Sequence, residues 1–407
     1  MACRRLVRAL RRHGTEATLL AQTVENPEYF EVAAANGWLQ RKAAFGRFAS
    51  ERLHFYLHEK SRAVRFAFSP ASVGMDISRH PAVRQADVIH LHWINFGFLS
   101  LLSLENLFAL GKPVVWTLHD MWAFTGGCHY SGECTHYQTH CHHCPFLRTA
   151  SAHDLSFRVF EEKARIFAKT PRIHFVTCSQ WLANCLKVSA LLGKFPVTAI
   201  PNPIDTALYA PLQQAAMRQK LGLPADKKLI LFGAMNTQDP RKGFAYLAEA
   251  LRKIARTSQN GDTDGLELVI FGKANPDALA ALPFRVHDYG AVRGDAALVD
   301  LYNACDLLVL PSLEDNLPNT VMEALACGVP AVAFDTGGLP EMIDHSRNGY
   351  LARYRSAEDL AEGIRFVLDN ARKNQLKEAA RQSATERFSE AAVAARYQDV
   401  YRLAFGV

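Results

Sequence analysis

The sequence lacks any long uninterrupted apolar run. Its longest apolar stretch, residues 96–110, is broken by serines, Glu105 and Asn106. No segment approaches the ~18 continuous apolar residues that a membrane-spanning helix needs. The N-terminus also lacks the apolar core of a signal peptide. We therefore expect a soluble, cytoplasmic protein.

The composition shows no sign of disorder or low complexity. Hydrophobic residues make up 49% and charged residues 21% of the 407 residues, which excludes a disordered or collagen-like chain. At roughly 100–200 residues per domain, this length predicts two domains, or three. The formal net charge is +6, and residues 1–65 carry all of this excess, with twelve basic and six acidic side chains.

Short apolar runs alternate with amphipathic segments along the chain. Apolar runs of four to six residues separated by helical segments are typical of buried parallel strands in βαβ units. The pattern predicts an α/β protein of two doubly wound, Rossmann-like domains facing a cleft, with ligands at the carboxyl ends of the strands. We expect strands at residues 17–24, 88–92, 114–119, 174–178, 197–200, 229–232, 266–271, 306–310 and 329–334. We expect helices at residues 4–12, 155–168, 180–191, 244–255 and 389–405, and helices that start at 295 and 320.

A Pro- and Asn-rich linker at residues 201–205 separates the two halves. We predict an acceptor-side domain at 1–205, a ligand-binding domain at 206–388, and a C-terminal helix at 389–407 that crosses back to the first domain. The first domain begins with the helix at 4–12, although a domain of this kind should open with a strand and a Gly-rich turn. We therefore expect that Met1 is an internal methionine and that the first strand is missing from the sequence.

A pair of cations precedes a predicted helix in the second half. The strand at 229–232 leads into Gly233 and then through a loop to Arg241 and Lys242, directly before the helix at 244. Helix N-terminal amides and the helix dipole favour anions, and an arginine can bind two oxygens at once. The pair therefore suits a diphosphate. The alternative interpretation is a solvated surface.

A second loop, residues 311–318, joins a predicted strand to a predicted helix. Asn319 or Thr320 can cap this helix, and its free amides would face a bound phosphate. Glu323, one turn inside the helix, could accept hydrogen bonds from the hydroxyls of a ribose. The alternative is that Glu323 only stabilises the helix dipole. The pair Gly337-Gly338 permits a close approach to a ligand, although such pairs are usually only turns.

These residues resemble the donor half of retaining GT-B glycosyltransferases of the GT4 type, also described as glycosyl transferases group 1. The resemblance rests on Arg241-Lys-Gly243 and on the run Pro311-Ser…Asp315-x7-Glu323, which ends in Gly328-x-Pro330. It implies that residue 315, here the shorter Asp, contacts the donor sugar, that Glu323 holds the ribose, and that Lys242 contacts the diphosphate. The further donor-binding residues that we predict are Gly233, Asn316, Leu317, Pro318, Asn319 and Thr320.

The first half supplies a histidine at the end of the strand at 114–119. The resemblance implies that His119 contacts the donor sugar near the reacting centre, so we place it with Arg241, Lys242 and Asp315 as a catalytic residue. A strand-end histidine is otherwise more often structural. The weaker acceptor-side candidates are Trp93, Asn95 and Asp120.

Four of the nine cysteines fall within residues 128–144, interleaved with histidines. Cytosolic chains rarely keep disulfides, so Cys128, Cys134, Cys141 and Cys144 favour a structural zinc site. Free or redox-active thiols are the alternative. The block at 118–145 resembles a bacterial branch of GT4 enzymes of the colanic-acid and exopolysaccharide type.

Together these patterns predict a retaining glycosyltransferase that moves a sugar from a nucleotide diphosphate to a hydroxyl of a lipid-linked or oligosaccharide acceptor. The resemblance implies a place in bacterial exopolysaccharide, capsule or lipopolysaccharide synthesis. No Asp-x-Asp pair lies near the predicted cleft, so we expect no catalytic metal. One alternative is a nucleotide-sugar epimerase or hydrolase with the same nucleotide site. A zinc-dependent nucleic-acid-binding protein is a distant alternative, because residues 128–144 contain no Lys or Arg.

The basic front of the chain also contains many aromatic residues. Between residues 41 and 68, seven Lys or Arg side chains alternate with six Phe or Tyr side chains. Such a surface suits the anionic inner face of a plasma membrane, and we expect peripheral contact there and no nucleic-acid partner. A solvated helical face is the alternative.

Overall fold

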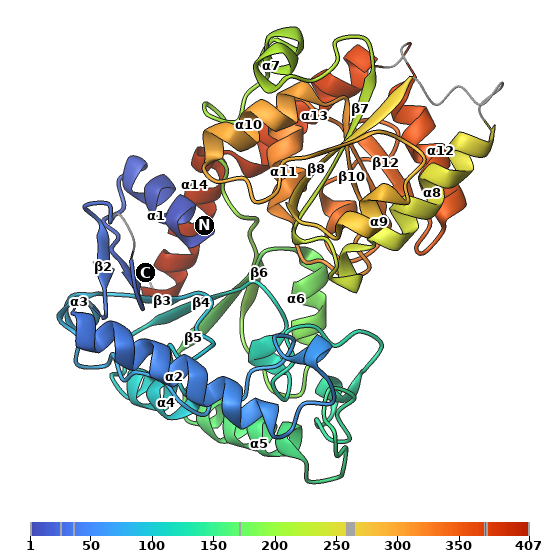
Figure 1. Ribbon diagram of the computed structural model, residues 1–407. Helices are drawn as coiled ribbons and strands as arrows, with labels where there is room; N and C mark the ends of the chain where they lie inside the picture. The colour runs from blue at the N-terminus through green and yellow to red at the C-terminus, as the bar shows by residue number, and fades with distance from the viewer. Residues whose placement is uncertain are drawn as a thin grey trace. The chain divides into compact units, whose positions relative to one another are not determined.

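The computed structural model describes residues 2–24, 27–35, 37–170, 172–257, 265–369, 371 and 373–405. The chain divides into two compact units (Figure 1). Unit 1 comprises residues 1–201 and 394–407, and unit 2 comprises residues 202–393. Each unit contains parallel strands and the helices that connect them, so the predicted α/β class is confirmed.

Unit 2 is built on one six-stranded parallel sheet in the order β12-β11-β10-β7-β8-β9. The strands are β7 (Lys228–Asn236), β8 (Leu266–Lys273), β9 (Val286–Asp288), β10 (Leu307–Leu310), β11 (Ala331–Phe334) and β12 (Gly349–Ala352). Residues 229–232 and 307–309 are fully buried, as expected for central strands covered on both faces. Successive strands run outward from β7 in one direction and from β10 in the other. The strand order therefore reverses between β7 and β10.

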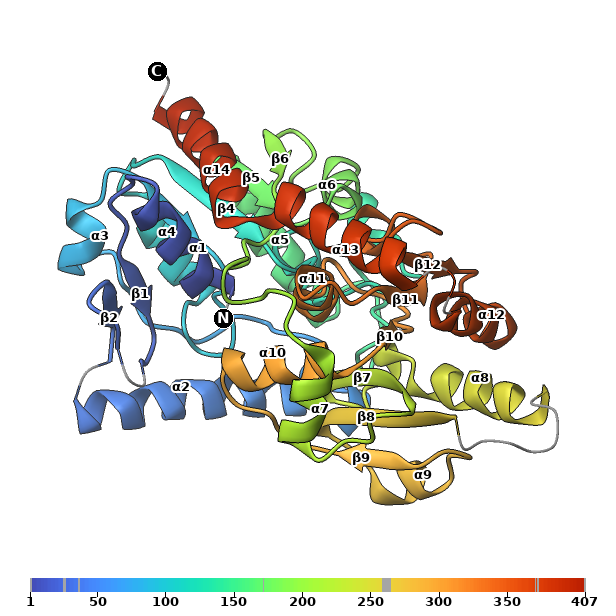
Figure 2. The same ribbon diagram turned by 90° about the horizontal axis from the view of Figure 1, so that it is seen from above.

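Helices cover both faces of this sheet (Figures 1 and 2). Helix α8 packs against α12, α11 packs against α13, and α10 packs against α7. Their bounds are α7 (Gln214–Leu221), α8 (Phe244–Thr257), α9 (Pro276–Ala280), α10 (Asp295–Ala304), α11 (Asn319–Ala326), α12 (Ala357–Leu368) and α13 (Lys373–Phe388). Two single-turn 3-10 helices, η4 (Pro240–Lys242) and η6 (Leu339–Glu341), lie in the loops.

Unit 1 contains two parallel sheets. A four-stranded sheet has the order β3-β4-β5-β6, and a separate pair joins β1 to β2. The strands are β1 (Leu19–Ala21), β2 (Glu31–Ala33), β3 (Ile89–Leu91), β4 (Val114–Leu118), β5 (Ile173–Thr177) and β6 (Val197–Ala199). Trp116 on β4 is buried and stacks on Phe175 of β5, so the centre of the larger sheet forms part of the core.

Helices also pack on both sheets of unit 1. Helix α4 packs against α5, and α1 packs against β1. Helix α14 lies beside β3 and β4, because the Tyr401 hydroxyl is 2.8 Å from His90 Nδ1 and the Tyr397 hydroxyl is 3.0 Å from Thr117 Oγ1. The bounds are α1 (Ala2–Arg12), α2 (Trp38–Tyr56), α3 (Pro81–Gln85), α4 (Leu101–Phe108), α5 (Leu155–Ala168), α6 (Gln180–Lys187) and α14 (Glu390–Phe405). Short 3-10 helices lie at η1 (Arg62–Val64), η2 (Trp122–Phe124) and η3 (His136–Gln138).

Some predicted element limits are wrong. The helix predicted at 180–191 ends at Lys187, because the Ser189 hydroxyl accepts the Leu192 amide and starts a new turn. The strand predicted at 229–232 continues to Asn236, since β8 runs on beside it. The strand predicted at 17–24 is limited to Leu19–Ala21. Over the described ranges, no helix is both long and apolar enough to cross a membrane.

Candidate active site

The reversal of strand order in unit 2 fixes where a ligand would bind. In open parallel sheets, loops from the carboxyl ends of the two strands at the reversal diverge to opposite faces and leave a crevice. Here β7 and β10 are these strands. The loop after β7 carries Arg241 and Lys242 in η4, and the loop after β10 carries Asp315. The topology thus brings together residues that lie more than 70 positions apart in the sequence.

An ion pair joins the two loops. Lys242 Nζ lies 2.6 Å from Asp315 Oδ2, and the side chains of both residues are largely buried. The Ser312 hydroxyl donates to the same carboxylate oxygen at 3.3 Å. Arg241 donates to Asp239 Oδ2 at 2.7 Å, and its carbonyl accepts the amide of Leu313 at 2.7 Å. The cations are therefore held in place by acidic partners that an incoming anion could replace.

Two glycines allow the loops to approach this closely. Gly243 has a φ of +70°, and a Cβ atom there would lie 1.8 Å from the carbonyl oxygen of Pro311. Gly337 has a φ of +60°, and its Cβ would lie 2.1 Å from the carbonyl oxygen of Asp315. The amide of Gly338 donates to that oxygen at 3.1 Å. Side chains are excluded at both positions by backbone conformation and by space.

Helix α11 begins at Asn319 and carries Glu323 in its second turn. The sequence predicted that Asn319 or Thr320 caps this helix, and that is wrong. Pro318 is the N-cap residue and makes no side-chain cap, while Asn319 Oδ1 accepts a hydrogen bond from Asn202 at 3.2 Å. Proline favours such a position because its φ is already suitable and it has no amide to satisfy.

Glu323 is 2% exposed and is oriented by a buried tyrosine. The Tyr302 hydroxyl donates to Glu323 Oε2 at 2.8 Å. Burial, together with the neighbouring carboxylate, raises the pKa of Tyr302 well above its usual value. The phenol therefore stays protonated and remains a donor, which fixes the direction of the Glu323 carboxylate.

The other predicted donor-binding residues lie in three different parts of unit 2. Asn316, Leu317 and Pro318 lie in the loop between β10 and α11 and are buried. Thr320 lies in the first turn of α11 and is half-buried. Gly233 lies inside β7, where a Cβ would be 2.0 Å from the ring of Phe271. The contact that the structure shows for Gly233 is therefore packing against β8.

In unit 1, His119 directly follows β4 and contacts two neighbouring side chains. Its Nε2 lies 3.0 Å from Nδ1 of His92, and its Nδ1 lies 3.4 Å from Sγ of Cys178. Burial lowers the pKa of His119 to about 4, although Asp120 opposes this shift. Burial also raises the pKa of Cys178 to about 12, so the thiol can donate to His119. His119 is therefore a neutral imidazole whose ring orientation is fixed by His92 and Cys178.

We expect the free energy of unfolding of unit 1 to fall at low pH, in part because His119 is protonated on unfolding. The folded chain keeps this imidazole neutral down to about pH 4, whereas an unfolded chain protonates it near its ordinary pKa of 6.5. Between these values the unfolded state binds more protons, so the free energy of unfolding falls as the pH falls, by up to ~3 kcal/mol. All five tryptophans lie between residues 38 and 181, so tryptophan fluorescence during urea unfolding reports on this unit.

The matched variants for this measurement are His119→Gln and His13→Gln. His119→Gln should lose only the part of the fall in stability between pH 6.5 and pH 4 that His119 contributes, because burial also lowers the pKa of His90 and of His92. His13, which is exposed, should be replaceable without effect. Equal pH slopes in the wild type and in His119→Gln would show that this imidazole is not held neutral by the fold.

The acceptor-side candidates also belong to unit 1. Trp93, Asn95 and His119 line one cavity, with Trp93 half exposed and Asn95 buried. Within the described part of the chain, Nδ2 of Asn95 has no hydrogen-bond partner. Asp120 lies beside them and accepts His129 Nδ1 at 2.8 Å. Burial opposes ionisation of Asp120, but His129 and the Trp122 amide lower its pKa on balance.

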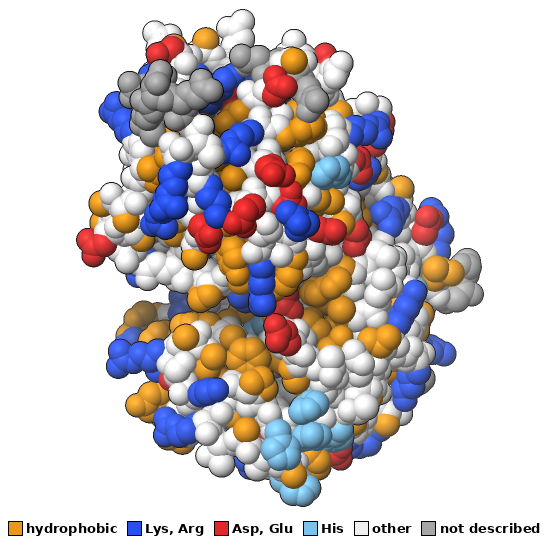
Figure 3. All heavy atoms as spheres, turned by 90° about the vertical axis from the view of Figure 1, so that its right-hand side faces the viewer, with side chains coloured by type: hydrophobic (Ala, Val, Ile, Leu, Met, Phe, Trp, Pro, Cys, Tyr) orange, Lys and Arg blue, Asp and Glu red, His pale blue; other side chains and the backbone are white. Residues whose placement is uncertain are grey.

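The four clustered cysteines surround a small cavity in unit 1. Cys128, Cys134, Cys141 and Cys144 line a space of about 20 Å³ together with His136 and His142. Other histidines of this segment are close by, since His142 Nδ1 lies 2.8 Å from His143 Nδ1, and Figure 3 shows histidine side chains gathered on this surface. Over the residues that the structure covers, no three His, Cys, Asp or Glu side chains are arranged to hold a metal ion. The zinc site stays a prediction.

The structure thus brings Arg241, Lys242 and Asp315 together in unit 2, with Glu323 in the adjoining helix. His119 and the acceptor-side candidates belong to unit 1. Sequence reasoning missed the partners Tyr302, Cys178 and His92. Only His92 had a visible signal, since His90 and His92 alternate along one strand and so share a face of the sheet.

Comparisons with known proteins agree with this architecture. A family model described as Glycosyltransferase Family 4 matches residues 2–208, and one described as Glycosyl transferases group 1 matches residues 226–370. A protein of Escherichia coli K12, named as the colanic acid biosynthesis glycosyl transferase WcaC, is 28% identical over 280 residues. The match covers 65% of this chain and 63% of that protein, which is less than two thirds of its length.

Two solved structures show the same fold. Sucrose-phosphate synthase from Thermosynechococcus elongatus matches with a TM-score of 0.66 at 19% identity, over 99% of this chain and 92% of that one. HepE of Anabaena, in complex with UDP-glucose, matches with a TM-score of 0.56 at 20% identity, over 79% of this chain and 80% of that one. Both likenesses show the GT-B fold. Because the first family model covers half of the chain, the protein belongs to Glycosyltransferase Family 4 and is a glycosyltransferase.

Proposed function

We propose that this glycosyltransferase moves a sugar from a nucleotide diphosphate donor to an acceptor hydroxyl, with retention of the anomeric configuration. The observation that carries the proposal is the Lys242–Asp315 pair at the reversal of strand order, with 2.6 Å between the charged atoms, on the loops that precede α8 and α11. A cation and a carboxylate on the two loops at the reversal of strand order, with the N-terminus of α11 following the second loop, suit a sugar diphosphate. HepE, a structural neighbour, was solved with UDP-glucose.

The chemical problem is the charge that develops on the leaving group. As the bond between the anomeric carbon and the phosphate oxygen breaks, negative charge grows on the β-phosphate. Lys242 and Arg241, with the amides at the start of α11, stabilise that charge. The acceptor oxygen bonds to the same face of the anomeric carbon, and its proton passes to the departing phosphate oxygen. Asp315 orients the sugar, so no side-chain nucleophile is needed.

The test is a thermal-shift screen of UDP-, GDP- and dTDP-sugars, followed by turnover with the donor that binds. A bound donor should stabilise the protein by mass action, in proportion to the logarithm of its concentration above Kd. The anomeric configuration of the product, read by NMR, should match that of the donor. Inversion would overturn the mechanism. Product formed from the donor alone would favour the epimerase or hydrolase alternative.

We propose that the acceptor is a lipid-linked or oligosaccharide glycan of bacterial exopolysaccharide, capsule or lipopolysaccharide synthesis. The similarity to the relative named for colanic acid biosynthesis supports this. The surface of unit 1 supports contact with a membrane. Helix α2 exposes Trp38, Leu39 and Phe45 beside exposed Arg41 and Lys42, and Lys42 Nζ lies 3.8 Å from the centre of the Trp38 ring.

The membrane proposal predicts salt-sensitive binding to anionic vesicles. The protein should sediment with vesicles that contain phosphatidylglycerol but not with pure phosphatidylcholine. Changing both Arg41 and Lys42 to Ala should weaken this binding at least ~10-fold, at ~1 kcal/mol per cation. Leu212→Ala, which removes an exposed apolar side chain from unit 2, is the control. Binding that does not respond to salt, or none at all, would exclude this surface as a membrane contact.

We also propose a structural zinc ion at Cys128, Cys134, Cys141 and Cys144. The four thiols line one cavity whose volume of about 20 Å³ has room for an ion, and binding would draw the sulfur atoms inward. Elemental analysis should find about one zinc per chain. Cys141→Ser should lose the metal, whereas Cys305→Ser, at a buried cysteine of unit 2, should keep it. A metal-free wild-type protein would leave these residues as free thiols.

A further inference from the structure

Both ring nitrogens of His119 are used within the protein. Nε2 of His119 lies 3.0 Å from Nδ1 of His92, and Nδ1 of His119 lies 3.4 Å from Sγ of Cys178. The ring of His92 is different, because among the described residues only its Nδ1 has a hydrogen-bond partner. Nε2 of His92 is therefore the outer end of a chain of polar groups that begins at Cys178.

The rings of His92 and His119 are nearly parallel and meet at their nitrogens. The ring planes are inclined by 24°, and the ring centres are 5.3 Å apart. The two nitrogens are 3.0 Å apart, and the remaining distance is about one ring radius on each side, so both nitrogens lie between the centres. A ring N–H and a ring lone pair each lie in the plane of their ring. One of these rings therefore donates to the other.

The protonation states decide which ring donates. Burial lowers the pKa of His92 well below its usual value and that of His119 to about 4, so each ring is neutral and has one N–H. Burial raises the pKa of Cys178 to about 12, so the thiol keeps its proton. An imidazole lone pair is a good acceptor for this S–H, whereas sulfur accepts an N–H only weakly. His119 therefore accepts at Nδ1 and donates from Nε2 to His92.

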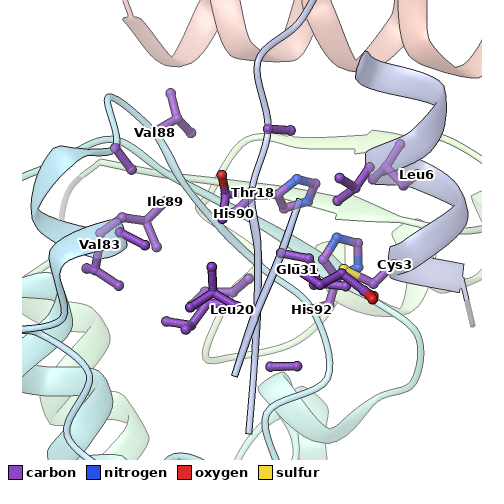
Figure 4. Close-up of a pocket in the computed structure, with 18 of the residues that line it drawn as sticks. Cys3, Leu6, Thr18, Leu20, Glu31, Val83, Val88, Ile89, His90 and His92 are labelled. Carbon is purple, nitrogen blue, oxygen red and sulfur yellow. The ribbon is translucent and has the colours of Figure 1, made fainter. Parts of the chain in front are cut away.

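Because His92 accepts at Nδ1, its own proton is on Nε2. Figure 4 shows the His92 ring among the side chains that line a cavity of unit 1, and Trp93 and Asn95 line the same cavity. Trp93 is half exposed. Asn95 is 4% exposed, and its Nδ2 has no hydrogen-bond partner in the described part of the chain. An aromatic ring beside N–H donors suits a sugar, whose apolar face packs on the ring while its hydroxyl oxygens accept the hydrogen bonds.

We propose that His92 contacts the substrate, by donating from Nε2 to a hydroxyl oxygen of a pyranose of the glycan acceptor that packs on Trp93. Cys178 and His119 are then positioning residues, which act by fixing the tautomer of His92. The direction of the chain matters, because an N–H leaves the hydroxyl proton in place, whereas a bare lone pair would bind that proton. This role deepens the proposed function and rests on its glycan acceptor.

The tautomers can be read by NMR on the full chain. The protein has 16 histidines, and labelling only these with 15N allows long-range 1H–15N spectra to show which nitrogen of each ring carries the proton. The signals of His92 and His119 are those missing from His92→Gln and His119→Gln. Both rings should carry the proton on Nε2. A proton on Nδ1 of His92 in the wild type would overturn the proposal.

The positioning role of Cys178 has its own matched variants. Cys178→Ala removes the donor to His119, so both tautomers of His119 and His92 should become populated. Cys178→Ser keeps a donor, and Cys305→Ala changes a buried cysteine of unit 2, so both should leave the tautomers unchanged. Identical histidine spectra in Cys178→Ala and Cys178→Ser would overturn the role of Cys178.

Contact with a sugar is tested with the methyl glycosides of glucose, galactose and mannose as probes. At least one should change the Nε2 signal of His92 in the wild type. His92→Asn has an amide near the position of Nδ1 but no outer N–H, so it should bind that glycoside at least ~5-fold more weakly. His92→Gln has an amide near the position of Nε2 and should bind within about 2-fold of the wild type. Cys178→Ala, which leaves His92 in place, should also weaken binding.

Two results would overturn the contact with a sugar. One is a His92 signal that none of the three glycosides changes, and the other is equal affinity of His92→Asn and the wild type. Neither the tautomers nor glycoside binding requires a donor, so they can agree with this role even if the donor screen fails. Conversely, full glycosyl transfer by His92→Asn would overturn the role of His92 and leave the proposed function intact.

Discussion

Replacing Lys242 with alanine is expected to lower kcat at least ~100-fold, the loss typical of removing one donor to a developing oxyanion. Lys242 is the cation that joins the two loops at the reversal of strand order, through its 2.6 Å contact with Asp315. Its removal takes away both the charge beside the predicted β-phosphate and the partner that holds the sugar-binding carboxylate. Steady-state kinetics with the donor found by the thermal-shift screen would measure the loss.

The matched control is Lys220→Ala. Lys220 also makes a 2.6 Å ion pair within unit 2, with Asp300, but its side chain is exposed. Exposed pairs are worth about 1 kcal/mol or less, so this variant should keep near wild-type turnover and stability. If Lys242→Ala retained the turnover of Lys220→Ala, the assignment of the phosphate site would fail.

Gly243→Ala should damage both stability and catalysis. The added methyl carbon would lie 1.8 Å from the carbonyl oxygen of Pro311, and the backbone at φ +70° already disfavours a side chain. The loop must therefore move, at a cost on the order of 3 kcal/mol in the free energy of unfolding. Because Lys242 is the adjacent residue, a shift of about 1 Å should also lower kcat on the order of 100-fold.

Gly222→Ala is the control that distinguishes the cost of a positive φ from the cost of the close contact with Pro311. Gly222 has nearly the same conformation, with a φ of +66°, but nothing lies within 4 Å of the position where its Cβ would be. This variant should lose only about 1 kcal/mol and keep its activity. Calorimetric unfolding and kinetics of the two variants form the comparison. Similar losses in both would show that the close contact with Pro311 is not what demands glycine.

The architecture could be predicted from the sequence, because buried parallel strands appear in it as continuous apolar runs. Continuous apolar runs such as Leu307–Leu310 and Ala331–Phe334 are hydrophobic on both faces, and they became the central strands of unit 2. Short edge strands such as Val286–Asp288, in which none of the three side chains is fully buried, have no such signal. Their limits depend on pairing with distant segments.

The residues of the candidate site can likewise be separated into those that the sequence predicts and those that it does not. The charged residues Arg241, Lys242 and Asp315 could be predicted, because cations before a helix and a carboxylate after a strand are local patterns. The side chains that orient the site could not. Tyr302 lies 21 residues from Glu323, and Cys178 lies 59 residues from His119, so only the folded sheet brings each pair together.

The reversal of strand order also constrains how the protein can fold during synthesis. The central contact of unit 2 pairs Ile230 of β7 with Leu307 of β10, 77 positions later. Closing so long a loop is slow, and β7 cannot gain its second neighbouring strand before β10 has been synthesised. When translation has reached only α10, β7 and β8 have been synthesised but β10 has not. The edge of β7 that will pair with β10 is then unpaired. The anion site would be among the last parts of unit 2 to form, which makes this interval the stage at which a nascent chain most needs a chaperone.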